Sequence, residues 1–248
     1  MKKLILLSLL TSCLFSSNVF AQSKAEDIFK TYRFGLFMGP TFNSLKPTSS
    51  SIDNYNVEKV KGNVGFSFGI TADYNINERY TMYSGLGLDW RGGTLNTYHD
   101  DTAIKSEYVR SANILYKQQY LTIPFGLKMV ATKFDKVKIF AQTGFDLAFL
   151  LSQKGDYTII KGDSSKTSES KTKVKLSGYA NGVPINLGWT LGVGGEYDLN
   201  GSNTVVFTIL YRNGFVDATS PKTNKSNYKF SDGNIRSNTI ALRIGYFF

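Results

Sequence analysis

The chain has 248 residues, a length that suits one large domain or two small ones. Its residues are 42% hydrophobic and 14% aromatic, with a mean hydropathy of −0.18, a profile that excludes both a bundle of membrane helices and a disordered chain. The net charge is +10, and the single cysteine and single histidine leave little scope for metal or thiol chemistry.

The N-terminus has the features of an export signal. A basic start at residues 1–3 precedes the apolar run 4–10, and small side chains lead to a signal-peptidase site between Ala21 and Gln22. We therefore predict that residues 1–21 are a cleaved signal peptide. The stretch 10–13 resembles a lipobox, so a cut before its cysteine is the alternative.

The strongest pattern in the chain is an alternation of apolar and polar residues. Seven consecutive even positions from Val64 to Ile76 are apolar, and the residues between them are polar or glycine. The same period continues from Tyr80 to Trp90, and a tight turn at residues 77–79 joins the two stretches. Because successive side chains of a strand point to opposite faces, the pattern predicts strands with one apolar face.

Six further stretches are interpreted as strands, which gives eight in total. In chain order they are residues 33–42, where the period is weaker, and then 120–129, 137–151, 185–197, 205–212 and 239–248. Short connections near 77–79, 131–136 and 198–203 alternate with long polar ones at 43–63, 95–113, 152–184 and 216–237. This alternation is typical of an up-and-down outer-membrane barrel with short periplasmic turns, long external loops and both termini periplasmic.

The second face of the strands is polar and charged, whereas the apolar face has no charged residue. A soluble barrel of the lipocalin type would place the apolar face inside, but its outer surface would then lack the charges that water-facing strands carry. We expect the charged face to line a narrow lumen closed by ion pairs; a conduction path with charged walls is the alternative. The residues of this predicted network are Asp73, Asp89, Arg91, Lys128, Lys138, Asp146, Glu196, Arg212 and Arg243.

The sequence thus predicts an all-β protein whose fold is an eight-stranded antiparallel up-and-down transmembrane β-barrel. No apolar run after the signal could cross a bilayer as a helix, so a membrane-embedded domain must be a closed barrel. We assign residues 22–31 to a short periplasmic segment and residues 32–248 to the barrel. Ten strands remain open, because residues 157–160 have the β propensity to extend a hairpin above the membrane. The low-complexity run 161–173 is predicted to be a mobile loop.

The chain ends on a row of apolar side chains at Ile244, Tyr246 and Phe248. This ending resembles the signal by which the outer-membrane assembly machinery engages the last strand of a barrel. A lipid-facing strand that ends with aromatics at the membrane interface has the same pattern, and one row of side chains can serve both purposes.

Three strands resemble the PorT-like porin family of outer-membrane β-barrel proteins common in Bacteroidetes. Residues 119–128 (QYLTIPFGLK) are similar to the family's YLEIPLLLK strand, with Thr122 in place of the usual acidic residue. Residues 186–196 are similar to its glycine-rich strand, and 244–248 to its closing strand. The resemblance implies the barrel fold and the outer membrane. Because one namesake belongs to the type IX secretion and gliding apparatus, it also implies an accessory role in secretion as an alternative.

Candidate sites of chemistry are few. His99 with Asp100 and Asp101 is the one place for a catalytic histidine, but no activated serine accompanies it, so we predict no enzyme activity. No cofactor or metal is expected. The long connections 152–184 and 216–237 are basic and could contact lipopolysaccharide.

We therefore expect an outer-membrane protein of a Gram-negative bacterium with a structural or binding role through its external loops. Its expected partners are membrane lipid, lipopolysaccharide and, during biogenesis, the barrel-assembly machinery. An extracellular or secretion partner is also open. We expect a monomer and no nucleic-acid binding. A narrow solute pore and a type IX-like secretion component are the alternative functions.

Overall fold

The computed structural model describes residues 31–48, 51–52, 55–100, 105, 108–173, 181–200, 203–220 and 234–248. The chain divides into two units, Met1–Lys30 and Thr31–Phe248, and all described residues belong to the second. The predicted signal peptide, its cleavage site between Ala21 and Gln22, and the predicted segment up to residue 30 lie outside the described residues. Within the described part of the chain, no helix is long and apolar enough to cross a membrane.

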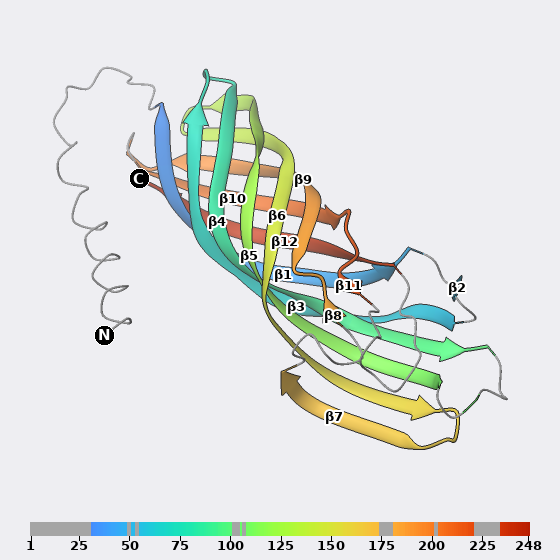
Figure 1. Cartoon of the computed structure of the whole chain (residues 1–248). Helices are drawn as coiled ribbons and strands as arrows, with labels where there is room; N and C mark the ends of the chain where they lie inside the picture. The colour runs from blue at the N-terminus through green and yellow to red at the C-terminus, as the bar shows by residue number, and fades with distance from the viewer. Residues whose placement is uncertain are drawn as a thin grey trace, which may run out of the picture. The chain divides into compact units, whose positions relative to one another are not determined.

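Eight antiparallel strands close into a ring (Figure 1). They are β1 (Tyr32–Pro47), β3 (Tyr55–Asn75), β4 (Tyr80–His99), β5 (Val109–Phe134), β6 (Val137–Lys161), β9 (Ile185–Asp198), β10 (Thr204–Gly214) and β12 (Ile235–Phe247). Each strand pairs with its neighbour along the chain, and β1 pairs with both β3 and β12, which leaves no open edge in the ring. The predicted all-β fold and the eight-stranded barrel are confirmed, including the weak first strand.

The two faces of the wall differ as the period of two requires. In β1 the odd residues from Gly35 to Leu45 are buried, whereas Leu36, Met38 and Phe42 between them are exposed. The same exposed apolar face continues on the other strands, for example at Ile70 and Phe207. A water-facing surface would not gather so many large apolar side chains, so this face suits the hydrocarbon core of a bilayer.

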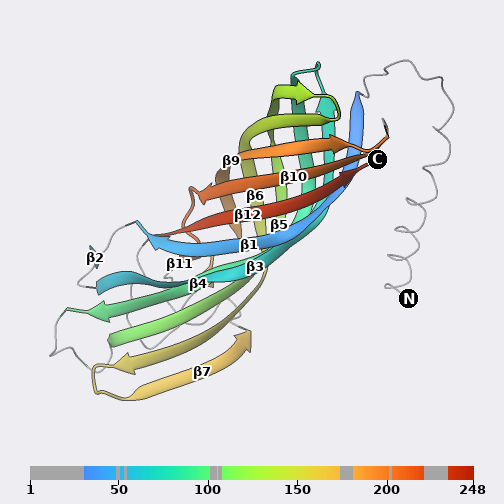
Figure 2. The same ribbon diagram turned by 180° about the vertical axis from the view of Figure 1, so that it is seen from behind.

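The strands differ greatly in length, and the excess lies at one end of the ring. β5 has 26 residues and β6 has 25, whereas β10 has 11 and β12 has 13. A strand needs only about 9–11 residues to cross a bilayer. The long strands therefore continue past the ring, at the end opposite the short turns and the C-terminus (Figure 2). We call these two ends the extended end and the turn end.

An open antiparallel sheet forms the extended end. β6 leaves β9 after the pair Phe149 and Ile185, and from Lys154 onward it pairs with β7 (Lys166–Lys173). On the other side β2 (Ser51–Ile52) pairs with β3. We refer to β2 and β7 together with the parts of β3–β6 beyond the ring as the extended sheet.

The extended sheet corrects the prediction that the long connections are polar loops. Much of 43–63, 95–113 and 152–184 is strand, and the run 161–173, predicted to be mobile, supplies β7. The physical reason is local pairing. Residues 157–160 continue β6 as their β propensity predicts, and a tight turn at 162–165 folds the chain back beside them. In that turn the Asp163 carboxylate accepts hydrogen bonds from the Ser165 side chain and from Ser165 N, the latter at 2.9 Å, and these bonds lower the pKa of Asp163.

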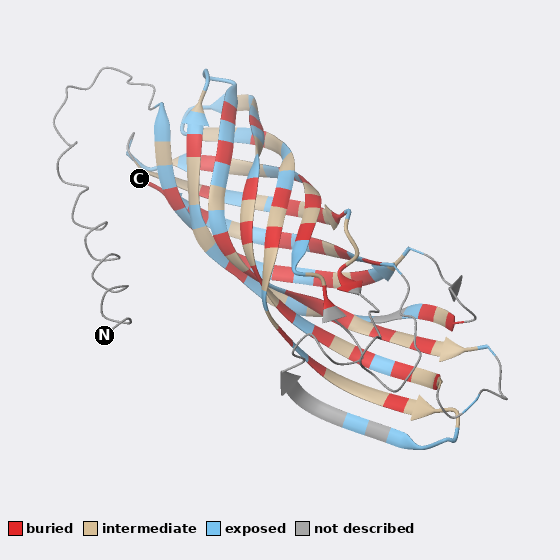
Figure 3. Ribbon diagram, viewed as in Figure 1, coloured by how far each residue is buried: buried red, intermediate tan, exposed pale blue. Residues whose placement is uncertain are grey.

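The inner face of the extended sheet has an apolar core of its own (Figure 3). Its members are Leu45, Tyr55, Val57, Leu95, Val109, Ala112, Ile114, Tyr116, Ile159, Ala218 and Ile235. Leu45 is on β1, Ile235 is on β12, and Ala218 lies between β10 and β11, so this core joins the extended sheet to strands outside it. The extended end is thus a packed structure with a buried apolar core, and not a set of loops.

A two-stranded sheet lies against the mouth of the ring at the extended end. β8 (Asn181–Gly182) pairs with β11 (Thr219–Ser220). Gln118 donates to Gln153 at 3.0 Å and to the Ala218 carbonyl at 3.4 Å, so both glutamines contact this sheet. Gly182 packs closely against the two glutamine side chains, because a Cβ there would lie 3.0 Å from Gln118 Nε2 and even closer to Gln153, so a larger residue would require these side chains to move. The β8–β11 sheet therefore covers the lumen on this side.

Asp217 fixes the chain just before β11. Its carboxylate accepts hydrogen bonds from Ile235 N at 2.8 Å and from Thr219 N at 3.1 Å. Burial raises the pKa of Asp217 in spite of these bonds. The contact joins the β10–β12 connection to the start of β12 and holds β11 over the mouth.

The apolar core predicts a local effect of core mutations. Leu95→Ala removes a side chain that is 1% exposed and should destabilise the extended sheet by about 2–5 kcal/mol. Trypsin should then cut purified protein faster after Lys166, which lies on β7, while the heat-modifiable mobility of the barrel on gels stays unchanged. Leu199→Ala, in an exposed turn at the other end, is the control and should leave cleavage unaltered. Equal cleavage rates in both variants would contradict the assignment.

Candidate functional site

Four charged side chains form a cluster in the lumen near the turn end. Arg33 contacts Asp73 at 2.8 Å and Glu196 at 2.9 Å, and Lys128 contacts the same two carboxylates at 2.8 and 3.1 Å. The two cations and two carboxylates balance in charge. The aromatic rings of Phe140 and Phe247 lie beneath Lys128 at 4.8 and 5.3 Å. We call these four charged residues the turn-end cluster.

Five more charged residues form a second cluster farther along the lumen. Arg91 contacts Asp89 at 2.9 Å and Asp146 at 2.7 Å. Arg212 lies 2.5 Å from Asp89 and 3.2 Å from Asp146. Arg243 is more distant, with Nη2 4.0 Å from Asp89 Oδ1. These five residues, which we call the mid-barrel cluster, come from β4, β6, β10 and β12, so the ion pairs reach across the lumen.

Tyr83 is a third component of the lumen. Its hydroxyl lies 3.3 Å from Thr190 Oγ1 on β9, although Tyr83 itself is on β4. The ring passes the directly paired Gly126 and Gly144, where a Cβ on either glycine would come within 2.8 Å of the Tyr83 hydroxyl. The glycines of the polar face therefore make room for a large side chain that lies along the inner wall over β5 and β6. The interior of the barrel is filled with side chains, as expected for a ring of eight strands.

The structure places the predicted lumen residues as follows. Eight of the nine lie in the two clusters, namely Asp73, Asp89, Arg91, Lys128, Asp146, Glu196, Arg212 and Arg243. Lys138 differs. It pairs in register with Glu196 at the turn end but is only half-buried, and it makes none of the ion pairs among the described residues.

Arg33 belongs to the turn-end cluster although the sequence pattern did not identify it. It lies at the start of β1, where Leu36, Phe37 and Pro40 obscure the period of two. A signal was nevertheless present. The even residues Phe34, Leu36, Met38 and Phe42 are apolar, so the period of two within β1 itself places the odd residues, Arg33 among them, on the inner face.

The C-terminal row lies on the outer face of the barrel. Ile244, Tyr246 and Phe248 are 45%, 41% and 51% exposed on or just after β12. Their placement is compatible with lipid contact, and their use by the assembly machinery remains a prediction.

The candidate histidine lies among aromatic rings at the tip of the extended sheet. His99 packs edge-on against Tyr55 at 4.8 Å and lies 6.5 Å from Tyr108. Burial raises the pKa of Tyr55 to about 12. Asp100 accepts a hydrogen bond from Asn56, and Asp101 lies outside the described residues. Among the described residues no group of three or more His, Cys, Asp or Glu side chains could hold a metal ion.

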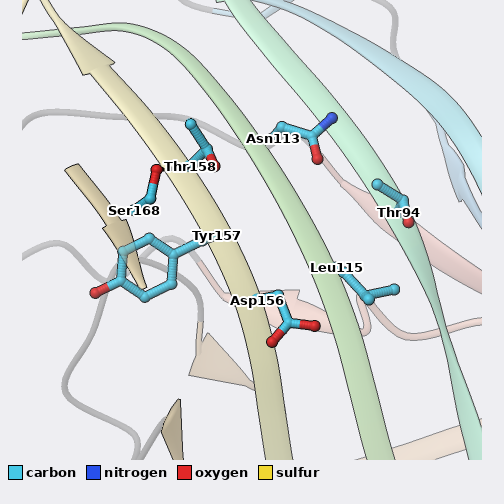
Figure 4. A pocket seen from close by; sticks show the side chains of 7 residues that line it. All are labelled: Thr94, Asn113, Leu115, Asp156, Tyr157, Thr158 and Ser168. Atoms are coloured by element: carbon cyan, nitrogen blue, oxygen red, sulfur yellow. Dashed lines mark hydrogen bonds between the residues drawn. The ribbon is translucent and has the colours of Figure 1, made fainter. Parts of the chain in front are cut away.

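The outer face of the extended sheet has an open hollow of about 400 Å³ (Figure 4). It is lined by Thr94, Asn113, Leu115, Asp156, Tyr157, Thr158 and Ser168, from β4, β5, β6 and β7. Thr158 and Ser168 point toward each other, with their hydroxyls 3.2 Å apart. Asp156 pairs with the exposed Lys117 at 3.1 Å. This surface offers several hydroxyl and amide groups within a short distance. The sequence pattern did not predict it, because it depends on the strand register in the extended sheet.

A family comparison identifies the class of protein. A sequence model of the family described as the outer membrane protein beta-barrel domain matches residues 20–220. This match spans most of the chain, which therefore belongs to that family, and the closed ring with an apolar outer face agrees with it. Membership assigns the protein to the outer-membrane β-barrel proteins of Gram-negative bacteria. The narrower resemblance to PorT-like proteins stays a prediction. No curated protein matches the sequence significantly.

Solved structures similar to this chain are also outer-membrane proteins. OprG from Pseudomonas aeruginosa is 11% identical over 90% of this chain and 99% of its own, with a TM-score of 0.45. Ail, the attachment invasion locus protein of Yersinia pestis, is 12% identical over 87% and 98%, with a TM-score of 0.36. The outer membrane protease OmpT from Escherichia coli is 6% identical over 88% and 96%, with a TM-score of 0.40. Similarity at this level carries no argument about the role of this chain.

The mid-barrel cluster predicts a large effect of removing one carboxylate. Asp89→Asn keeps the shape of the side chain but leaves Arg91 and Arg212 short of a counter-charge, which should destabilise the barrel by about 3–5 kcal/mol. Urea unfolding followed by tryptophan fluorescence measures the loss. Asp156→Asn is the matched control, because its ion pair with Lys117 is exposed and should contribute only about 0–1 kcal/mol. Similar losses in both variants would contradict a buried, closed cluster.

Proposed function

We propose that the protein is a non-conducting outer-membrane barrel that binds a ligand at the cell surface through its extended sheet. The observation that carries this proposal is the contrast between the two ends of the molecule. Two ion-pair clusters and Tyr83 occupy the lumen, while the extended sheet has its own apolar core. In such a barrel the polar groups that a ligand can reach lie outside the ring. We propose no catalytic role.

The proposal includes an orientation. Short turns join β3 to β4, β5 to β6 and β9 to β10, and β1 begins and β12 ends beside them. In outer-membrane barrels the short turns and both termini are periplasmic and the long connections are external. By this rule the extended sheet is external and both barrel termini face the periplasm.

The hollow on the extended sheet supports a polar, hydroxyl-rich ligand. Asn113, Thr158 and Ser168 supply donors and acceptors that suit sugar hydroxyls. Lys117 and Lys154 are exposed register partners beside it and favour an anionic ligand. We therefore propose the saccharide part of lipopolysaccharide as the ligand of this face, with the protein acting as a monomer.

An accessory role in a type IX-like secretion machinery is the alternative, and the likeness of residues 119–128 to the PorT-like strand supports it. Secretion components recovered with the protein from native membranes at a defined stoichiometry would favour this alternative. A narrow solute pore is the other alternative, which a conductance would reveal.

Binding to immobilised lipopolysaccharide from the native outer membrane tests the proposed function. The triple variant Asn113→Ala, Thr158→Ala and Ser168→Ala should bind at least about tenfold more weakly, because each lost hydrogen bond contributes about 0.5–1.5 kcal/mol. Glu58→Ala, an exposed change on β3 outside the hollow, is the control. Unchanged binding by the triple variant would overturn the assignment of this face.

Protease digestion of intact cells tests the orientation. Trypsin added to intact cells should cut after the exposed Lys166 and leave the exposed Lys133, near the turn end, protected. Cleavage after Lys133 alone would reverse the proposed orientation without bearing on the binding experiment.

A further inference from the structure

The mid-barrel cluster is not balanced in charge. It contains three guanidinium groups, from Arg91, Arg212 and Arg243, but only two carboxylates, from Asp89 and Asp146. An arginine keeps its proton in any protein environment, so the excess cannot be removed by deprotonation. The turn-end cluster is neutral and offers no spare carboxylate. One net positive charge is therefore left inside a barrel whose wall faces lipid.

Arg243 is the group without a full partner. Its Nη2 is 4.0 Å from Asp89 Oδ1, too far for a hydrogen bond, and neither Nε nor Nη2 has a hydrogen-bond partner among the described residues. Both nitrogens are buried, and the whole side chain is only 11% exposed. The guanidinium lies 4.3 Å above the Phe37 ring. A cation–π contact of this kind offsets part of the cost of burial but supplies no counter-charge.

Other polar atoms of the mid-barrel cluster also lack hydrogen-bond partners. Arg212 Nη2 has no hydrogen-bond partner among the described residues either. Oδ1 of Asp89 and Oδ1 of Asp146 likewise have no hydrogen-bond partner among the described residues, and a buried water is the usual partner of such atoms. Water does not, however, neutralise a charge, and an uncompensated ion in a low-dielectric interior is very costly.

We propose that the lumen holds one small monovalent anion against Arg243, bound by its Nε and Nη2 and by Nη2 of Arg212. The charge of the ion follows from the excess of one. Chloride is a suitable probe, because Phe37 packs 4.3 Å beneath the Arg243 guanidinium and leaves the edge with Nε and Nη2 as the place where a compact ion would bind. Charge-assisted hydrogen bonds from guanidinium groups are strong ligands for such an ion. The site makes the anion part of the closure of the lumen.

Urea unfolding at neutral pH tests the proposal on the full barrel in phospholipid vesicles. Chloride is raised from about 1 to about 100 mM while gluconate, a bulkier anion, holds the ionic strength constant. The wild-type midpoint should rise with chloride, because a ligand that binds the folded state stabilises it. A midpoint that does not change with chloride would overturn the site.

Arg243→Met and a matched control assign the effect to one residue. The Arg243→Met variant should lose the dependence on chloride, and in gluconate its midpoint should equal or exceed that of the wild type, because the excess charge is gone. Arg236→Met, an exposed change on the same strand, should keep the wild-type dependence. An Arg243→Met barrel that still responds to chloride would contradict the proposal.

A built-in counter-charge provides a test that does not rely on removing Arg243. Thr208 on β10 is the direct cross-strand partner of Arg243 on the lumen face, so Cβ atoms at the two positions are about 4.5–5.5 Å apart. Thr208→Asp should replace the anion, with a midpoint independent of chloride and at least as high as that of wild type in saturating chloride. A Thr208→Asp variant that retains the wild-type chloride dependence would overturn the proposal even if Arg243→Met fails to fold.

Discussion

Charge inside a membrane barrel has to be compensated within the barrel, because the lipid on the other side of the wall cannot solvate it. Alternation with a period of two sends the charged residues of every strand into the same narrow space. An eight-stranded ring leaves that space only wide enough to be filled by side chains. Arg33, Asp73, Lys128 and Glu196 satisfy this constraint with matched ion pairs, and the mid-barrel cluster satisfies it except for Arg243. The charged side chains of the lumen therefore pair with one another and stabilise the wall of the barrel.

Because side chains fill the lumen, the polar surface that a ligand can reach lies at the two ends of the barrel. At the turn end the connections are short and the barrel termini meet. At the extended end four strands continue beyond the ring and bury an apolar core that includes Leu95, Tyr116 and Ile159. The strands β9, β10 and β12 are short and do not continue into the extended sheet. The β8–β11 sheet covers the mouth of the ring on their side. A packed sheet holds the residues of the hollow in fixed positions, which loops of the same sequence would not do.

The strand faces could be predicted from the sequence because they depend only on the local period. The strongest alternation, from Val64 to Ile76, covers the second half of β3 and requires no knowledge of its partner strands. The ion pairs could not be predicted, because Arg212 and Asp89 are 123 residues apart and meet only once the ring has closed. The sequence pattern did not identify Arg33 as a lumen residue, because Phe37 and Pro40 interrupt the alternation of apolar and polar residues in β1. Lys138 followed the period, yet it lies at the end of the lumen and stays half-buried.

The extended sheet shows a different limit. Its strands are polar on the outer face, and a polar stretch between two membrane strands has the composition of a loop. The apolar residues of its inner face stabilise it as a sheet. There Leu45 on β1 and Ile235 on β12 pack with residues of β3–β6. Such contacts depend on the register and on closure of the ring, so local composition did not identify them. Residues 157–160 were the exception, because their β propensity alone predicts the extension of β6.

Planar-bilayer recording with purified protein tests most directly whether the lumen is sealed. The ion pairs across the mid-barrel cluster, together with the Tyr83 ring that fills the space over Gly126 and Gly144, predict no stable unitary conductance in wild-type protein. A steady unitary conductance in the wild type would contradict a sealed lumen and favour the narrow pore.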